Sequence, residues 1–244
     1  MIIYEIDNTL FGLYSAVFES YKMQEIPDIV TSKPLYQMPI GTKIKKIETD
    51  EKKANRVQTA IIKYAGEDTV QMLKIALKSC LDEKETICFN YIKKVIDSQK
   101  DIAFDYGDLT VMEFTDLKAK VGLEAHRFKG FLRFSETENG VLYAHYSPDN
   151  DITELIAHHF KKRFKYHAFI IHDEKRNIVA MYDTKTLKCF TPPVPLTVYI
   201  NETEENYRKL WKEYFDAVNI KERKNKKLQD NYLPRRYRKN LTEF

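Results

Sequence analysis

The 244-residue chain is poor in cysteine, with only Cys80, Cys88 and Cys189. An odd number of cysteines without close Cys-X-X-Cys spacing argues against a disulfide framework, a zinc knuckle or an iron–sulfur cluster held by this chain alone. No apolar run approaches 18 residues, so no membrane span is expected. The opening MIIYEIDNTLF has no basic segment and is interrupted by Glu5 and Asp7, which does not fit a signal peptide. These features predict a reduced, cytoplasmic, soluble protein.

The common catalytic signatures are also missing. The sequence contains no GxxxxGK[ST] phosphate loop, no GxGxxG, no GxSxG elbow and no HxE motif paired with PCxxC. No nucleophile or cofactor site can therefore be named, and we expect this chain to bind neither a metal nor a cofactor of its own.

Positive charge is concentrated near the C-terminus. The net charge is only +4, but nine basic and two acidic residues lie between Asn219 and Asn240, so the rest of the chain is mildly acidic. Arginine can donate two parallel hydrogen bonds to phosphate, and an adjacent tyrosine can stack on a base. A solvated terminus and an acidic protein partner are the alternatives. The candidate nucleic-acid contacts here are Lys224, Lys226, Lys227, Arg235, Arg236, Tyr237 and Arg238.

A second basic cluster occurs in the segment AHHFKKRFKYH. On a helix, His159 and Arg163 would share one face, as would His158 and Lys162. One interpretation is a half-buried His159 below a basic outer face. The sharper one is a second phosphate-contacting surface with Lys161, Lys162 and Lys165. The candidates for an enzymatic site are His158, His159 and Arg163.

Acidic residues offer little additional support for catalysis. Asp149, Asp151 and Asp173 fall at expected element boundaries, where aspartate is favoured as a turn or cap residue. Asp7, which follows the first expected strand, could be a catalytic carboxylate, but it fits turn chemistry equally well. Adjacent histidines point about 100° apart on a helix, and no acidic third ligand has metal-site spacing, so no metal site is predicted.

The hydrophobic pattern predicts a single α+β domain with three sections. Section 1–125 is helix-rich, with short strands near 1–7 and 42–49 and Gly66 as a helix stop. In section 126–200, apolar and polar residues alternate from 127 onward. Its ββαββ series predicts a small antiparallel sheet with a helix over one face. Turn signals at Asn139-Gly140 and 173–177 predict hairpins, and Asp151 with Glu154 resembles a capping box.

Section 201–244 begins with an amphipathic helix and continues into the basic segment. The apolar stripe of this helix predicts that it docks on the body of the protein. The stripe comprises Tyr207, Leu210, Trp211, Tyr214, Phe215 and Val218.

Three blocks of the sequence resemble a poorly characterised bacterial family of DNA metabolism and DNA repair proteins. The blocks are DNTLFGLYSAVFESYKMQEIP, HRFKGFLRFSETENGVLYAHYSPDNDITELIAHHFKKRF and WKEYFDAVNIKERKNKKLQDNYLPRRYRKNLTEF. In the last block, the matching positions are Asn225, Leu228, Gln229, Pro234, Arg235, Arg236 and Tyr237. Ala168 and Arg238 depart from the pattern, because the family often has tryptophan there.

The resemblance implies that this chain works as the partner of another protein. Similar proteins accompany a radical SAM protein, and a similar domain is fused to a uracil-DNA glycosylase. The iron–sulfur cluster and SAM would then belong to the partner, and no catalytic residue carries over. We therefore rank a DNA-binding accessory protein first, an enzyme acting directly on DNA second and a protein adaptor third. The sequence does not indicate an oligomeric state.

Overall fold

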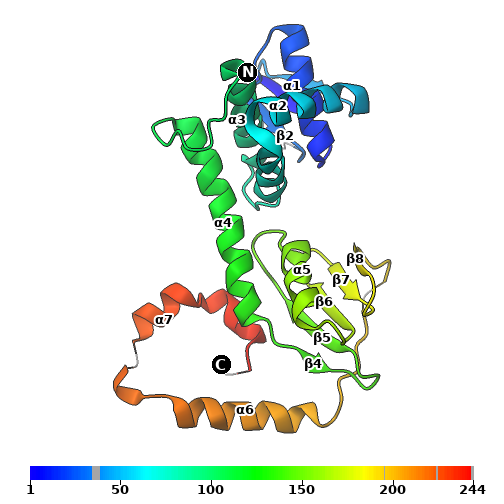
Figure 1. Cartoon of the computed structure of the whole chain (residues 1–244), viewed down its shortest axis with the longest axis vertical. Coiled ribbons are helices and arrows are strands. Elements are labelled where there is room, and N and C mark those ends of the chain that lie inside the picture. The colour runs from blue at the N-terminus through cyan, green and yellow to red at the C-terminus, as the bar shows by residue number, and fades with distance from the viewer. Residues whose placement is uncertain (35–38, 195, 224, 243–244) are drawn as a thin grey trace. The chain divides into compact units, whose positions relative to one another are not determined.

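The computed structural model describes residues 1–34, 39–194, 196–223 and 225–242 (Figure 1). The chain forms two compact units, Met1–Gly122 and Leu123–Phe244. Both helices and sheets are present, so the expected α+β class is confirmed. None of the helices in the described ranges is long and apolar enough to cross a membrane.

The N-terminal unit contains a parallel three-stranded sheet in the order β2-β1-β3. Its strands are β1 (Ile2–Glu5), β2 (Ile29–Thr31) and β3 (Lys43–Lys46). The two strands expected near 1–7 and 42–49 are thus confirmed. Helix α1 (Leu10–Met23) follows β1 and begins where the Thr9 hydroxyl accepts a hydrogen bond from the Gly12 amide at 2.9 Å.

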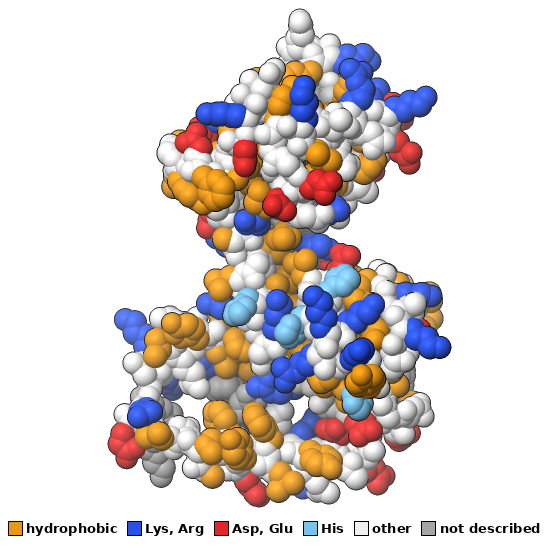
Figure 2. Space-filling model, viewed as in Figure 1, with side chains coloured by type: hydrophobic (Ala, Val, Ile, Leu, Met, Phe, Trp, Pro, Cys, Tyr) orange, Lys and Arg blue, Asp and Glu red, His pale blue; other side chains and the backbone are white. Residues whose placement is uncertain are grey.

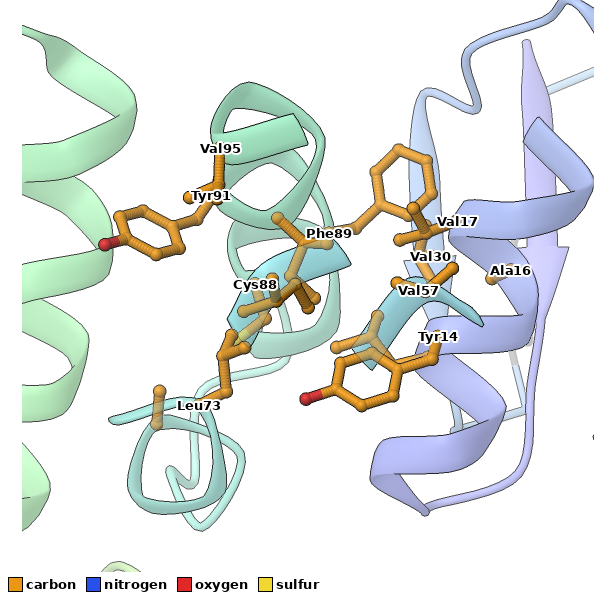
Figure 3. Close-up of a cluster of buried hydrophobic side chains, with 14 of the residues drawn as sticks. Tyr14, Ala16, Val17, Val30, Val57, Leu73, Cys88, Phe89, Tyr91 and Val95 are labelled. Atoms are coloured by element: carbon orange, nitrogen blue, oxygen red, sulfur yellow. The ribbon is translucent and has the colours of Figure 1, made fainter. Parts of the chain in front are cut away.

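Three longer helices continue the chain, namely α2 (Glu51–Ala76), α3 (Lys84–Ser98) and α4 (Leu109–Phe131). Gly66 interrupts α2 with φ 79° and ψ 170°, which agrees with its predicted role as a stop, although the helix resumes after it. Side chains from α1, α2 and α3 form the core of this unit, with Phe89 and Cys88 fully buried (Figure 3).

The C-terminal unit contains a five-stranded sheet in the order β4-β5-β6-β7-β8. The strands are β4 (Ser135–Glu136), β5 (Leu142–Tyr146), β6 (Phe169–Asp173), β7 (Ile178–Tyr182) and β8 (Leu187–Phe190). The expected antiparallel sheet is wrong in one respect, because β5 and β6 pair in parallel. Helix α5 (Thr153–Arg163) connects these strands and returns the chain to the same end of the sheet, which makes the pair parallel.

In this unit the predicted turns agree with the structure better than the predicted boundaries of helices and strands do. The hairpins at Asn139-Gly140 and 173–177 are confirmed, since β4 pairs with β5 and β6 with β7 in antiparallel register. The strand pattern expected from 127 is wrong up to Phe131, where α4 ends. The N-cap position of α5 is occupied by Ile152, one residue after the Asp151 start that the capping-box pattern predicted.

The C-terminal section contains α6 (Glu204–Val218), a short 3-10 helix η1 (Lys221–Arg223), α7 (Lys226–Tyr232) and a second 3-10 helix η2 (Arg235–Asn240). The predicted docking of α6 on the body is not observed, because none of its residues is buried. An apolar stripe shows that a helix is amphipathic, but it does not specify which surface the stripe meets.

Candidate nucleic-acid interface

Tyr237 anchors the basic C-terminal segment to the C-terminal unit. Its ring packs edge-on against Phe128 with centroids 4.8 Å apart, and its hydroxyl donates to Glu124 Oε1 at 2.6 Å. Only 7% of the residue is exposed, and burial raises the pKa of its phenol. The sequence suggested that the Tyr237 ring would stack on a base. In the structure the ring is instead packed in the core of the C-terminal unit.

The three arginines around Tyr237 form ion pairs within the chain. Arg235 lies 3.0 Å and Arg238 2.5 Å from Asp230, and their hydrogen bonds lower the pKa of that carboxyl group. Arg236 Nε donates to Asp149 at 2.8 Å. The order of residues in PRRYR thus serves to fasten the segment, although Arg235 and Arg236 still reach the surface.

The lysines upstream of this anchor behave differently. Lys226 and Lys227 are exposed and form no ion pair with any residue in the described part of the chain. Lys224 lies outside the described residues.

Glu124 is the buried centre of this anchor, and no motif or spacing in the sequence points to it. Only 5% of the residue is exposed, and its carboxylate accepts hydrogen bonds from the backbone amides of Asp149 and Asn150, both at 2.8 Å. The Asn150 side-chain amide donates at 2.6 Å, and Tyr237 completes the set. These donors replace the water that the charge loses on burial.

Two aspartates have the turn roles expected for them. Asp173 accepts hydrogen bonds from the amides of Lys175 and Arg176, and Arg176 Nη1 lies 2.9 Å from its carboxylate. Complete burial raises the pKa of Asp173 despite this partner. In the N-terminal unit, Asp7 accepts hydrogen bonds from the amide and hydroxyl of Thr9.

Helix α5 carries the second predicted basic cluster on its outer side. His158, Lys162 and Arg163 on the helix and Lys165 in the turn after it are exposed, and none forms an ion pair with a residue that the structure describes. Lys161 lies with its Nζ 5.6 Å from the centre of the Tyr182 ring. Figure 2 shows Lys, Arg and His side chains gathered on the visible face of this unit.

His159 is half-buried, as the simpler interpretation of this cluster predicted. Partial burial lowers the pKa of its imidazole, and the positive charges of Lys129, Arg163 and Lys162 lower it further. His159 is therefore expected to be neutral near pH 7, surrounded by cations.

One residue of the C-terminal segment, Lys239, lies on the face of the sheet opposite α5. Alternate residues of a strand point to opposite faces, and Tyr146 meets Thr153 of α5 through their hydroxyls at 2.8 Å. The neighbouring His145 therefore points to the other face, where Lys239 approaches Glu174 at 3.1 Å. Lys239 and the cations of α5 are therefore separated by the sheet.

The face opposite α5 borders a groove of about 780 Å³ within the C-terminal unit. One wall is the apolar stripe of α6, and the other comes from β4, β5 and the end of the chain. Its aromatic lining consists of Phe134, Tyr143, Tyr207, Trp211 and Tyr214, and its cationic lining of Arg133, Arg208 and Lys239.

A histidine–glutamate pair lies at the edge of this groove. His145 Nδ1 is 2.9 Å from Glu174 Oε1, while Ser147 and Lys239 donate to Glu174 Oε2 at 3.0 and 3.1 Å. Partial burial opposes ionisation of Glu174, but the hydrogen bonds from Lys239, Ser147 and His145 outweigh it and lower the pKa. His145 Nε2 makes no hydrogen bond with a described residue, so it can face a ligand.

Sequence reasoning missed this pair because its members lie 29 residues apart. Only the parallel pairing of β5 with β6 brings their strands together. Across the described parts of the chain, no cluster of three or more His, Cys, Asp or Glu side chains is placed to hold a metal ion.

Fold and site together define an α+β protein whose C-terminal unit combines exposed cations with an aromatic groove. The chain belongs to the DUF4130 family, a domain of unknown function, whose model matches residues 82–243. This region includes the second and third blocks of the resemblance described above, but not the first. The chain matches no curated protein and no solved structure.

Proposed function

We propose that this protein is a DNA-binding accessory protein that holds phosphate groups through the outer side of α5. The observation that carries the proposal is the set of cations on this helix that lack ion pairs with other described residues. The arginines of the C-terminal segment are, by contrast, paired with aspartates. Unpaired cations can bind phosphate without first giving up an internal partner.

The expected binding is electrostatic and largely independent of DNA sequence. If Lys161, Lys162, Arg163 and Lys165 each met one phosphate, log K would fall against log salt with a slope of about −3.6 on duplex DNA. Exposed Lys226 and Lys227 would add to this slope if the same duplex reached them.

The test is a fluorescence anisotropy titration of a labelled duplex at several salt concentrations. The double variant Lys162→Ala/Arg163→Ala should reduce the slope by about 2. The variant Lys46→Ala/Lys52→Ala, which removes two exposed charges from the N-terminal unit, is the matched control. Equal losses in both variants, or no binding at low salt, would contradict the proposal.

Under this proposal, a partner enzyme would supply the chemistry. From the resemblance, we propose a radical SAM or glycosylase-type partner, with any iron–sulfur cluster and SAM held there. The burial of Cys88 in the N-terminal core supports this assignment, because only two exposed cysteines remain in the chain. Co-purification of such a partner with the intact chain is the corresponding test.

A second candidate function is an enzyme that acts directly on DNA. The His145–Glu174 pair favours it, whereas the enzymatic site residues predicted from the sequence do not. His158, His159 and Arg163 make no hydrogen bond or ion pair with a carboxylate among the described residues. His145 is held at Nδ1 by Glu174, which leaves Nε2 to accept a proton from water or a hydroxyl group.

This candidate predicts turnover of an oligonucleotide by the purified protein alone. His145→Gln and Glu174→Gln should both abolish it while leaving DNA affinity intact, whereas His158→Gln should have no effect. Absence of turnover in the unmodified protein would leave only the binding role.

A further inference from the structure

We infer that the groove lined by α6 and by β4 and β5 binds single-stranded nucleic acid by stacking unpaired bases on its aromatic side chains. This site is separate from the α5 surface proposed above. It therefore adds a second ligand class to the C-terminal unit and does not depend on duplex binding.

The aromatic rings of α6 are available to a ligand. Tyr207, Trp211 and Tyr214 are 64%, 41% and 58% exposed, and all three line the groove. Three aromatic residues on one helical stripe are normally buried against a core, because each removes a large apolar area from water. Here the stripe faces a groove, so its rings keep faces that a flat ligand can cover.

The charge of the groove selects an anionic ligand. Arg133 and Arg208 contribute positive charge, whereas Lys239 is paired with Glu174 at 3.1 Å. The lining carboxylate of Glu204 accepts a hydrogen bond from the Glu136 amide at 2.6 Å. Arg208 Nη2 is held by the Ser135 hydroxyl at 3.0 Å, which fixes one cation beside β4. An uncharged apolar segment of a partner protein would not use these cations.

A ligand with both flat apolar faces and regularly spaced negative charges is a single nucleic-acid strand. Proteins that bind single strands combine aromatic stacking platforms with a cationic groove along the backbone. In a duplex, the base faces are already stacked on one another and cannot reach Trp211 or Tyr214. A volume of about 780 Å³ also lies within the range of sites that enclose a small ligand.

Trp211, the only tryptophan, provides the signal for the test. Titration of the intact chain with oligo(dT) should quench its fluorescence, and an abasic deoxyribose-phosphate strand of equal length should bind more weakly. Tyr214→Ala should weaken oligo(dT) binding by about fivefold to a hundredfold, the range expected for one lost stacking contact. Tyr214→Phe, which retains the ring, should bind like the unmodified protein.

Two further variants separate this inference from the proposed function. Tyr232→Ala removes a ring that is even more exposed, 68% against 58% for Tyr214, but lies outside the groove, and it should not change binding. The α5 variant Lys162→Ala/Arg163→Ala should weaken duplex binding but preserve quenching by oligo(dT).

The inference is overturned if oligo(dT) and the abasic strand bind equally, or if Tyr214→Ala binds as the unmodified protein does. It is also overturned if no strand binds, which would leave the groove to a protein partner. Loss of duplex binding alone would refute the α5 proposal and leave the groove site standing.

Discussion

Removing the hydroxyl of Tyr237 should destabilise the C-terminal unit by about 1.5 to 2 kcal/mol. That hydroxyl donates to Glu124 at 2.6 Å, and a hydrogen bond to a charged group contributes about 1.5–3 kcal/mol. The lower part of this range applies because Glu124 keeps three other donors, from Asp149 and Asn150. The ring remains in Tyr237→Phe, so its contact with Phe128 is retained.

Urea denaturation followed by Trp211 fluorescence measures this effect, because the tryptophan lies in the same unit. Tyr232→Phe, at an exposed tyrosine of the same segment, should change the free energy of unfolding by less than about 0.5 kcal/mol. A double-mutant cycle with Glu124→Gln should show coupling of at least about 0.5 kcal/mol. If Tyr237→Phe behaves like Tyr232→Phe, or if the effects of Tyr237→Phe and Glu124→Gln are additive, the hydrogen bond between Tyr237 and Glu124 is not what holds the segment.

Three further predictions concern other parts of the chain. Gly12→Ala should lower stability by about 1–3 kcal/mol in thermal unfolding. The added Cβ would lie 2.0 Å from an Asp7 oxygen that already accepts hydrogen bonds. Gly122→Ala is the control, because a Cβ at Gly122 would have no atom within 4 Å and should not lower stability. The carboxylate of Asp183 accepts hydrogen bonds from two backbone amides and a threonine hydroxyl, which lower its pKa to about 2. Its stabilising contribution should therefore be present above about pH 4 and lost as the pH falls toward 2, and the pH profile of Asp183→Asn should lack that component. Finally, a thiol reagent should modify two cysteines in the native protein and reach Cys88 only after unfolding, since burial raises the pKa of that thiol and blocks access.

Much of the secondary structure could be predicted because its causes are local. The Asn139-Gly140 turn gives a hairpin because Gly140 adopts φ 73°, a conformation that glycine reaches without strain. Gly66 breaks α2 for the same reason. The end of α4 was misplaced because residues 127–131 contain apolar side chains that fit a strand and a helix about equally well.

The candidate site was only partly predictable. The basic character of α5 and the half-buried position of His159 follow from helical spacing. The pairing of the C-terminal arginines does not follow from local spacing, because Arg236 and Asp149 are separated by 87 residues and meet only in the folded chain. The exposure of α6 could not be foreseen either, since an amphipathic stripe is compatible with a core, a groove or a partner.

The sequence by itself determined the type and approximate place of most elements, the hairpin turns and the concentration of positive charge, because each depends on neighbours within a few residues. Tertiary structure alone decided which cations are paired, which face of the sheet Lys239 occupies and where His145 meets Glu174. These properties depend on contacts between residues far apart in the chain. They anchored residues 235–238 of the C-terminal basic segment and left the cations of α5 and the aromatic stripe of α6 exposed.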